Sequence, residues 1–74
     1  SGVIDMFAFK KINSLIGKNV ILIDTDGEIF EGRIIDYEKP ADNEEEEFAV
    51  YFITVTGERW YFLEHEISSI ELKL

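Results

Sequence analysis

The chain contains no cysteine and no long apolar run. Without cysteine it can form neither a disulfide nor a thiolate metal site, and it has no cysteine nucleophile, so a small secreted disulfide scaffold is not expected. No apolar stretch approaches the roughly 18 to 20 residues of a membrane span, and no signal peptide is visible. We therefore expect a soluble, cytoplasmic protein without a membrane partner.

Basic residues are also scarce. The 74 residues include 7 lysines and arginines against 16 aspartates and glutamates, which gives a net charge of −9. Nucleic-acid binding is disfavoured by this balance, because contacts to the phosphate backbone require cations. The acidic residues gather in residues 38–47, which contain Pro40 and the run from Glu44 to Glu47. Such a segment repels itself and cannot form a core, so we predict a mobile acidic loop.

Groupings of residues that carry chemistry are missing as well. The chain has one histidine, and it has neither a glycine-rich phosphate loop nor a nucleophile elbow. Glu64 and Glu66 flank His65, but on a strand the two carboxylates would face away from the imidazole, so the three do not predict a metal site. We expect no enzyme activity, no cofactor and no bound metal.

The apolar pattern begins with a predicted helix in a single domain over residues 3–74. Apolar residues recur every three to four positions between Asp5, a residue type that caps helices, and Gly17, which suits a helix end. Residues 5–16 are therefore predicted to form a helix of about three turns.

Short strands are predicted for the rest of the chain. Asp26 and Gly27 lie between two apolar runs, which is a strong signal for a hairpin turn. Gly32 stands where a side chain would otherwise fill the interior, so its strand is expected to bend sharply or to contain a bulge. The predicted strands cover residues 19–24, 28–37, 48–55, 59–63 and 70–74. The fold class is mainly β, with an N-terminal helix followed by a five-stranded, strongly bent antiparallel small barrel.

This order of elements resembles that of Sm-like proteins of the Hfq and LSm type. Their first motif is matched by an apolar strand, two spaced glycines and an aromatic residue, and their closing string is matched by residues 63–68. The matching residues of the first motif are Val20, Ile21, Leu22, Ile23, Gly27, Phe30, Gly32, Ile34 and Tyr37. The resemblance implies an Sm-like barrel with SH3-like architecture. Spaced glycines also occur in other small barrels, so an SH3-like or Tudor-like domain remains the alternative.

The resemblance also implies a way of binding RNA. In Hfq-type rings a lysine of the closing string and its neighbours line a pore that holds uridines, and here Glu64 occupies the lysine position. By the same resemblance, Tyr37 and His65 are the candidate pore or RNA contacts. Because an anion replaces the cation at the phosphate, RNA remains a possible partner that the charge disfavours.

A short aromatic segment provides the second candidate site. On a strand, Trp60 and Phe62 share one face while Arg59 and Tyr61 share the other. One face is core and the other is a candidate contact surface, because aromatic residues and arginine dominate interface hot spots. The sequence does not decide which face is exposed. In Sm rings the fourth and fifth strands pair between neighbours, so the resemblance implies self-association through edge strands.

These observations predict a non-enzymatic Sm-like domain that acts as a protein interaction or assembly module, bound to a protein partner or to itself. The alternative is a divergent RNA-binding Sm-like ring protein. The charge alone also permits an acidic mimic that occupies a nucleic-acid-binding protein.

Overall fold

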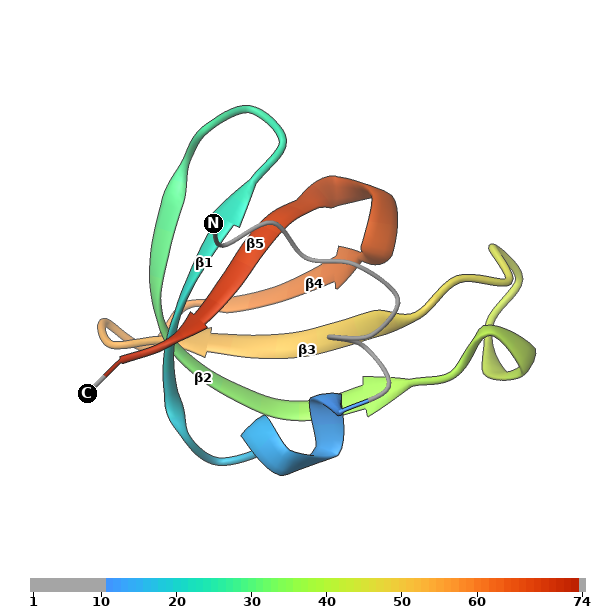
Figure 1. The fold of residues 1–74 in the computed structure, drawn as a ribbon, viewed down its shortest axis with the longest axis horizontal. Helices are drawn as coiled ribbons and strands as arrows, with labels where there is room; N and C mark the ends of the chain where they lie inside the picture. Colours follow the sequence, from blue (N-terminus) through green and yellow to red (C-terminus); the bar gives the residue numbers. More distant parts are fainter. Residues whose placement is uncertain (1–10, 74) are drawn as a thin grey trace.

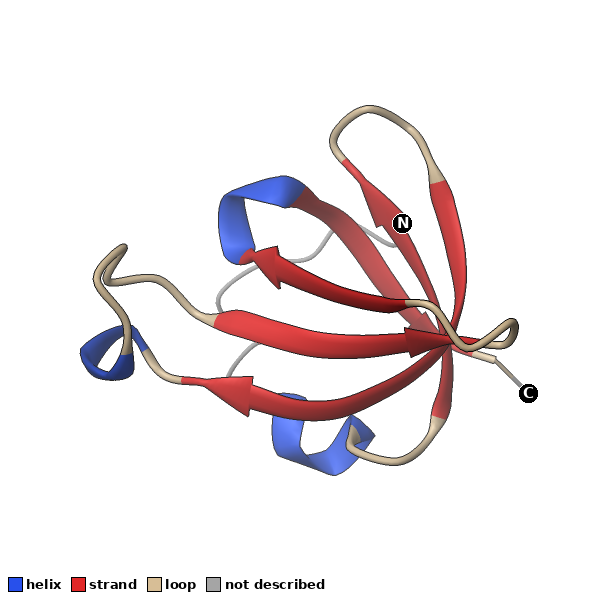
Figure 2. Ribbon diagram, turned by 180° about the vertical axis from the view of Figure 1, so that it is seen from behind, coloured by secondary structure: helices blue, strands red, loops and turns tan. Residues whose placement is uncertain are grey.

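The computed structural model describes residues 11–73 (Figures 1 and 2). Its five strands are antiparallel and form one strongly curved sheet in the order β4-β3-β2-β1-β5. The two outermost strands, β4 and β5, do not pair, so the sheet is not closed into a barrel. The prediction of a mainly β fold with five antiparallel strands is confirmed. The strands are β1 (Asn19–Asp24), β2 (Ile29–Glu38), β3 (Ala49–Thr54), β4 (Arg59–Leu63) and β5 (Ile67–Leu72).

The N-terminal helix predicted over residues 5–16 is not supported. Residues 5–10 lie outside the described residues, and Ile12–Leu15 form only a short 3-10 helix, η1. The Ser14 hydroxyl donates to the Lys11 carbonyl, a local bond that competes with helical pairing. Ile16 then turns extended and forms a bridge to β2. The apolar spacing fits a helix and a single turn equally well, because Ile12 is buried in either case.

The fifth strand begins earlier than predicted. It starts at Ile67 instead of residue 70, directly after the 3-10 turn η3 (Glu64–Glu66), and ends at Leu72. Ser69 faces the interior with 7% of its surface exposed. A buried serine interrupts the apolar alternation on which the prediction relied, so the sequence pattern concealed the first half of the strand.

The predicted hairpin turn between β1 and β2 is confirmed. Gly27 has a φ of +84°, a conformation that side chains rarely adopt. The Asp24 carboxylate stabilises the turn by accepting hydrogen bonds from the backbone N–H groups of Asp26 and Glu28, both at 2.9 Å.

Gly32 lies where the β3 backbone comes closest to β2, and the bulge of β2 follows two residues later instead of at Gly32 itself. It is paired with Val20 on β1 and with Thr54 on β3, so a strand lies on each side of β2 at this point. A Cβ atom at Gly32 would lie 2.0 Å from the Ile53 carbonyl oxygen, which shows how closely the β3 backbone approaches. The β2–β3 register then shifts between Ile34 and Asp36, a bulge that adds to the curvature.

The curved sheet encloses one small core. The η1 turn lies beside β2 and contributes one residue to it (Figure 1). Because β3 and β4 contribute through alternate side chains, their intervening side chains face outward. The core residues are Ile12, Val20, Leu22, Phe30, Ile34, Val50, Phe52, Phe62 and Ile67.

The acidic loop extends from the sheet between β2 and β3 (Figure 1). It contains a 3-10 turn, η2 (Pro40–Asp42), and begins after Glu38, which belongs to β2. The predicted loop of residues 38–47 is therefore present with both ends displaced by one residue, because β3 begins at Ala49. Its mobility stays a prediction.

Candidate functional site

The structure decides which face of β4 is exposed. Phe62 is 5% exposed and packs against Phe30 and Phe52 at ring-centroid distances of 5.1 and 6.1 Å. Trp60 shares this face at the rim of the core, where it stacks on Phe62 at 5.7 Å and still exposes 41% of its surface. Tyr61 lies on the opposite, outer face. The four residues predicted as an interaction surface thus lie in three environments: Phe62 is in the core, Trp60 is at the rim of the core, and Arg59 and Tyr61 are on the outer face.

Two tyrosines form a pair on the outer face. Tyr51 and Tyr61 lie opposite each other on β3 and β4, with ring centroids 4.9 Å apart. Both hydroxyls donate to the carboxylate of Glu38, at 2.8 Å from Tyr51 and 2.7 Å from Tyr61. The two residues remain 36% and 40% exposed. We call Tyr51 and Tyr61 the tyrosine pair.

Three carboxylates act on the tyrosine pair. The hydrogen bond to Glu38 raises the pKa of Tyr61 to about 12 and also raises the pKa of Tyr51. The nearby charges of Asp36 and Glu45 add to these increases, at Tyr51 and Tyr61 respectively. The two phenols in turn lower the pKa of Glu38. The pair is therefore a neutral aromatic surface in an anionic environment.

The backbone of β4 leaves hydrogen-bonding groups open. The β3–β4 ladder is flanked by bonds from Thr54 N–H to Glu58 O at 2.8 Å and from Glu64 N–H to Phe48 O at 2.8 Å. Since bonded pairs alternate in an antiparallel ladder, the backbone groups of Arg59 and Tyr61 point away from β3. Among the strands of residues 11–73, β4 is an outermost one, so these groups face the open edge of the sheet.

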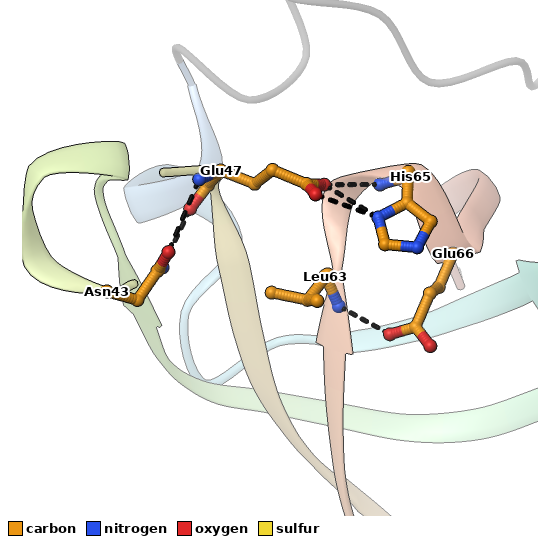
Figure 3. A network of polar contacts seen from close by, with 5 residues as sticks. All are labelled: Asn43, Glu47, Leu63, His65 and Glu66. Carbon is orange, nitrogen blue, oxygen red and sulfur yellow. Dashed lines mark hydrogen bonds and ion pairs between the residues drawn. The ribbon is translucent and has the colours of Figure 1, made fainter. Parts of the chain in front are cut away.

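The predicted histidine site is a polar contact between the acidic loop and η3 (Figure 3). His65 Nδ1 lies 2.9 Å from both carboxylate oxygens of Glu47, and the His65 backbone N–H donates to the same carboxylate at 3.0 Å. Asn43 accepts from and donates to the Glu47 backbone. Glu66 accepts a hydrogen bond from the Leu63 N–H at 2.9 Å, which occupies the end of the β4 edge.

This contact shifts the pKa of both partners. The hydrogen bond to Glu47 raises the pKa of His65, and the same bond lowers the pKa of Glu47. The His65 side chain is 65% exposed, so the pair is an exposed link.

The two candidate RNA contacts have separate environments. Tyr37, on β2, is half-buried and packs against the core, while His65, on η3, bonds to Glu47 of the acidic loop. The structure therefore gives the two residues different local roles.

The other edge of the sheet is β5. The Lys73 N–H donates to Asn19 O at 2.9 Å, so by alternation the backbone groups of Ile70 and Leu72 face outward. Lys73 also forms an ion pair with Glu31 on β2. Leu72 is 46% exposed, which leaves apolar surface on this edge.

The described part of the chain has few features of a metal site, a membrane span or a pocket. Within residues 11–73, no three histidine, cysteine or acidic side chains gather in a way that could hold a metal ion. The same residues include no helix with the length and apolarity needed to cross a membrane. A shallow, open depression of about 360 Å³ lies on the acidic loop, lined by Pro40, Ala41, Asn43 and Glu46.

Sequence reasoning missed two members of the outer surface, Tyr51 and Glu38. Tyr51 is separated from Glu38 by 13 residues and Tyr61 is separated from it by 23. The alternation in residues 48–55 contained a signal, because Tyr51 is a polar aromatic residue between two apolar neighbours. Its pairing with Tyr61 follows only from the register of β3 and β4.

Comparison of this chain with protein-family models, with curated proteins and with solved structures gave no match.

Proposed function

We propose that this chain is a non-enzymatic protein interaction or assembly module, which binds its partner through the open edge of β4. One observation carries the proposal. The backbone groups of Arg59 and Tyr61 face the open edge of β4, and this edge is flanked by a half-exposed aromatic residue on each face of the strand, Trp60 on one and Tyr61 on the other. An open edge can pair with another strand, and aromatic side chains on both of its faces add apolar contact to the backbone bonds.

We further propose that the domain is an Sm-like small barrel in the cytoplasm. The five antiparallel strands, the Gly27 turn and the close approach of β3 at Gly32 support the first part, and the lack of cysteine supports the second. In this family edge strands pair between subunits, so a second copy is one possible partner. RNA binding through Tyr37 and His65 has less support, since the core and Glu47 engage these side chains.

The experiment compares two substitutions at the first residue of β4. Arg59→Pro removes an outward N–H and places a ring at the edge, while the β3–β4 bonds on the other side are retained. Arg59→Ala removes the same charge and keeps the N–H. Circular dichroism establishes that both variants fold.

Each variant and the parent chain are then used to capture proteins from a cell extract, and light scattering measures the mass in solution. We expect the parent chain and Arg59→Ala to form the same complex, with a protein or with themselves, and Arg59→Pro to lose it. A complex that Arg59→Pro retains, or a monomer that captures nothing, would contradict the proposal.

A further inference from the structure

We infer that the partner of β4 is an extended basic segment, which adds as a strand with a lysine or arginine beside Tyr61 and an apolar side chain against Trp60. This inference rests on the proposed function, because it uses the same edge. It adds the chemistry of the partner and the orientation of its side chains.

The backbone fixes where the segment lies. Arg59 and Tyr61 offer outward N–H and C=O groups, whereas the Leu63 N–H is already occupied by Glu66. An added strand can therefore form a bonded pair with Arg59 and with Tyr61, but it meets the Glu66 side chain at Leu63. The accessible edge is short, which suits a peptide segment.

The outer face specifies a cation. A segment residue opposite Tyr61 points to the same face as the Tyr61 ring, because paired residues on neighbouring strands share a face. The ring faces of tyrosine attract cations. Glu38 binds both hydroxyls of the tyrosine pair, and the charges of Asp36 and Glu45 act on it. A lysine or arginine at this position thus meets aromatic rings and carboxylates together.

Arg59 determines where along the segment the basic residue lies. It lies two residues before Tyr61 on the same face and is exposed. A cation opposite Arg59 would be repelled, so the basic residue is favoured beside Tyr61, nearer to the acidic loop.

The inner face specifies an apolar neighbour. Trp60 lies at the rim of the core, tilted against Phe30 at 4.8 Å and stacked on Phe62. Its exposed 41% lies on an edge strand, where an apolar side chain of an added strand can cover it. Alternation along a strand places such a residue next to the basic one in the segment.

Charge complementarity favours this occupant over a second copy. The chain carries a net charge of −9, so two copies repel each other while a basic segment is attracted. The attraction weakens with salt, because exposed charges are screened beyond about 8 to 10 Å at ordinary ionic strength.

The test uses a short synthetic peptide in which valine alternates with polar residues, a single central lysine and otherwise glutamine, and a matched peptide in which glutamine replaces that lysine. Amide resonances of the full chain are followed by NMR during titration at low and at high salt. Binding to the edge should shift the Arg59 and Tyr61 amides, and the lysine peptide should bind more tightly than the glutamine peptide.

Three variants separate the contributions. Tyr61→Leu keeps the strand and removes the aromatic ring, so the lysine peptide should bind about two- to fivefold more weakly. Glu45→Gln removes a charge near the tyrosine pair and should weaken binding about twofold at low salt. Glu71→Gln makes the same charge change on β5 and should have little effect.

Specific outcomes would overturn the inference. Equal losses from Glu45→Gln and Glu71→Gln would reveal attraction by net charge only, and equal affinity for both peptides would remove the cation. If light scattering shows self-association that Arg59→Pro abolishes while the lysine peptide leaves the edge amides unshifted, the partner is a second copy and the proposed function stands. A complex that survives Arg59→Pro would refute the proposed function itself.

Discussion

Replacing Gly32 with alanine tests the close approach of strands that shapes this domain. The new Cβ would lie 2.0 Å from the Ile53 carbonyl oxygen, at least 1.0 Å short of the 3.0 Å that real Cβ atoms keep. It would also lie 2.7 Å from the Thr54 Cα. Both neighbours are backbone atoms, so a rotamer change cannot relieve the overlap and β3 must move away from β2.

The expected loss of stability follows from that movement. A shift of about 1 Å breaks local β2–β3 pairing, including the bond from Val55 N–H to Glu31 O, now 3.0 Å long. Two lost backbone bonds cost about 2 kcal/mol, and overpacking costs about 1–3 kcal/mol more. Alanine restricts the unfolded chain, which offsets about 0.4–1 kcal/mol. We therefore expect Gly32→Ala to lower the free energy of unfolding by about 2–4 kcal/mol, a large part of the stability of a small domain.

Urea unfolding followed by circular dichroism measures this change. With a slope of about 1 kcal/mol per molar urea, the midpoint should fall by about 2–4 M. Gly27→Ala is the control, because nothing lies within 4 Å of its new Cβ and only the φ of +84° is strained. That variant should lose about 1–2 kcal/mol. If Gly32→Ala unfolds within about 0.5 M of the parent chain, the backbones do not approach as closely as described.

Two further predictions concern the carboxylate contacts. Glu38→Gln should bring the pKa of Tyr61 from about 12 back toward 10.0, measured by the ultraviolet absorbance of tyrosinate. Because a raised pKa in the folded state stabilises the protein below the ordinary value, the parent chain should lose this stability between pH 10.0 and about 12, and the variant should lose less. His65→Gln should reduce stability most between about pH 4.5 and 6.5, where Glu47 and His65 are both charged. Urea midpoints measured across pH test this window: the His65 contribution disappears as pH rises through its raised pKa, and the Glu47 contribution disappears as pH falls through its lowered pKa.

Matched variants distinguish these effects from a general change of charge. Glu28→Gln removes a carboxylate from the β1–β2 hairpin and should leave the titration of Tyr61 unchanged. Glu44→Gln removes a charge from the acidic loop, and its loss of stability should show no maximum between pH 4.5 and 6.5. A tyrosinate titration that Glu38→Gln leaves unaltered would show that the carboxylate does not hold the phenols. A destabilisation by His65→Gln that is constant with pH would rule out its charge as the cause.

Local chemistry made much of the fold predictable. The bounds of β1 and β4 follow from uninterrupted apolar and aromatic runs, the turn follows from Gly27, and Gly32 lies where only a residue without a side chain fits between β2 and β3. The predicted helix failed in its described part because a 3.6-residue spacing cannot distinguish several helical turns from one turn that buries Ile12. The start of β5 failed because Ser69 is polar and buried.

The candidate site depended more on register than on residue type. The sequence placed Arg59 and Tyr61 on one face, but it could not decide between that face and the one with Trp60 and Phe62. Burial of Phe62 against the core decides it. The open edge of β4 is a property of the strand order, which no single stretch of sequence contains.

The acidity of the chain has two physical roles. Several carboxylates accept hydrogen bonds inside the fold: Asp24 from the hairpin backbone, Asp36 from the Tyr37 N–H, and Glu66 from the Leu63 N–H. These groups satisfy backbone donors at turns and strand ends, so their presence does not require an external basic partner.

The side chains of Glu44 and Glu45 differ from those acceptors. They are exposed on the acidic loop, and within residues 11–73 no hydrogen bond or ion pair engages them. The charge of Glu45 nevertheless acts on the Tyr61 phenol, so unneutralised negative charge acts on the outer face of β4. Net charge alone would attract a cation to any acidic part of the surface. The negative charge at Tyr61 occurs together with exposed rings and unpaired backbone groups. This combination favours an extended segment, because only a strand can engage the charge, the rings and the backbone together.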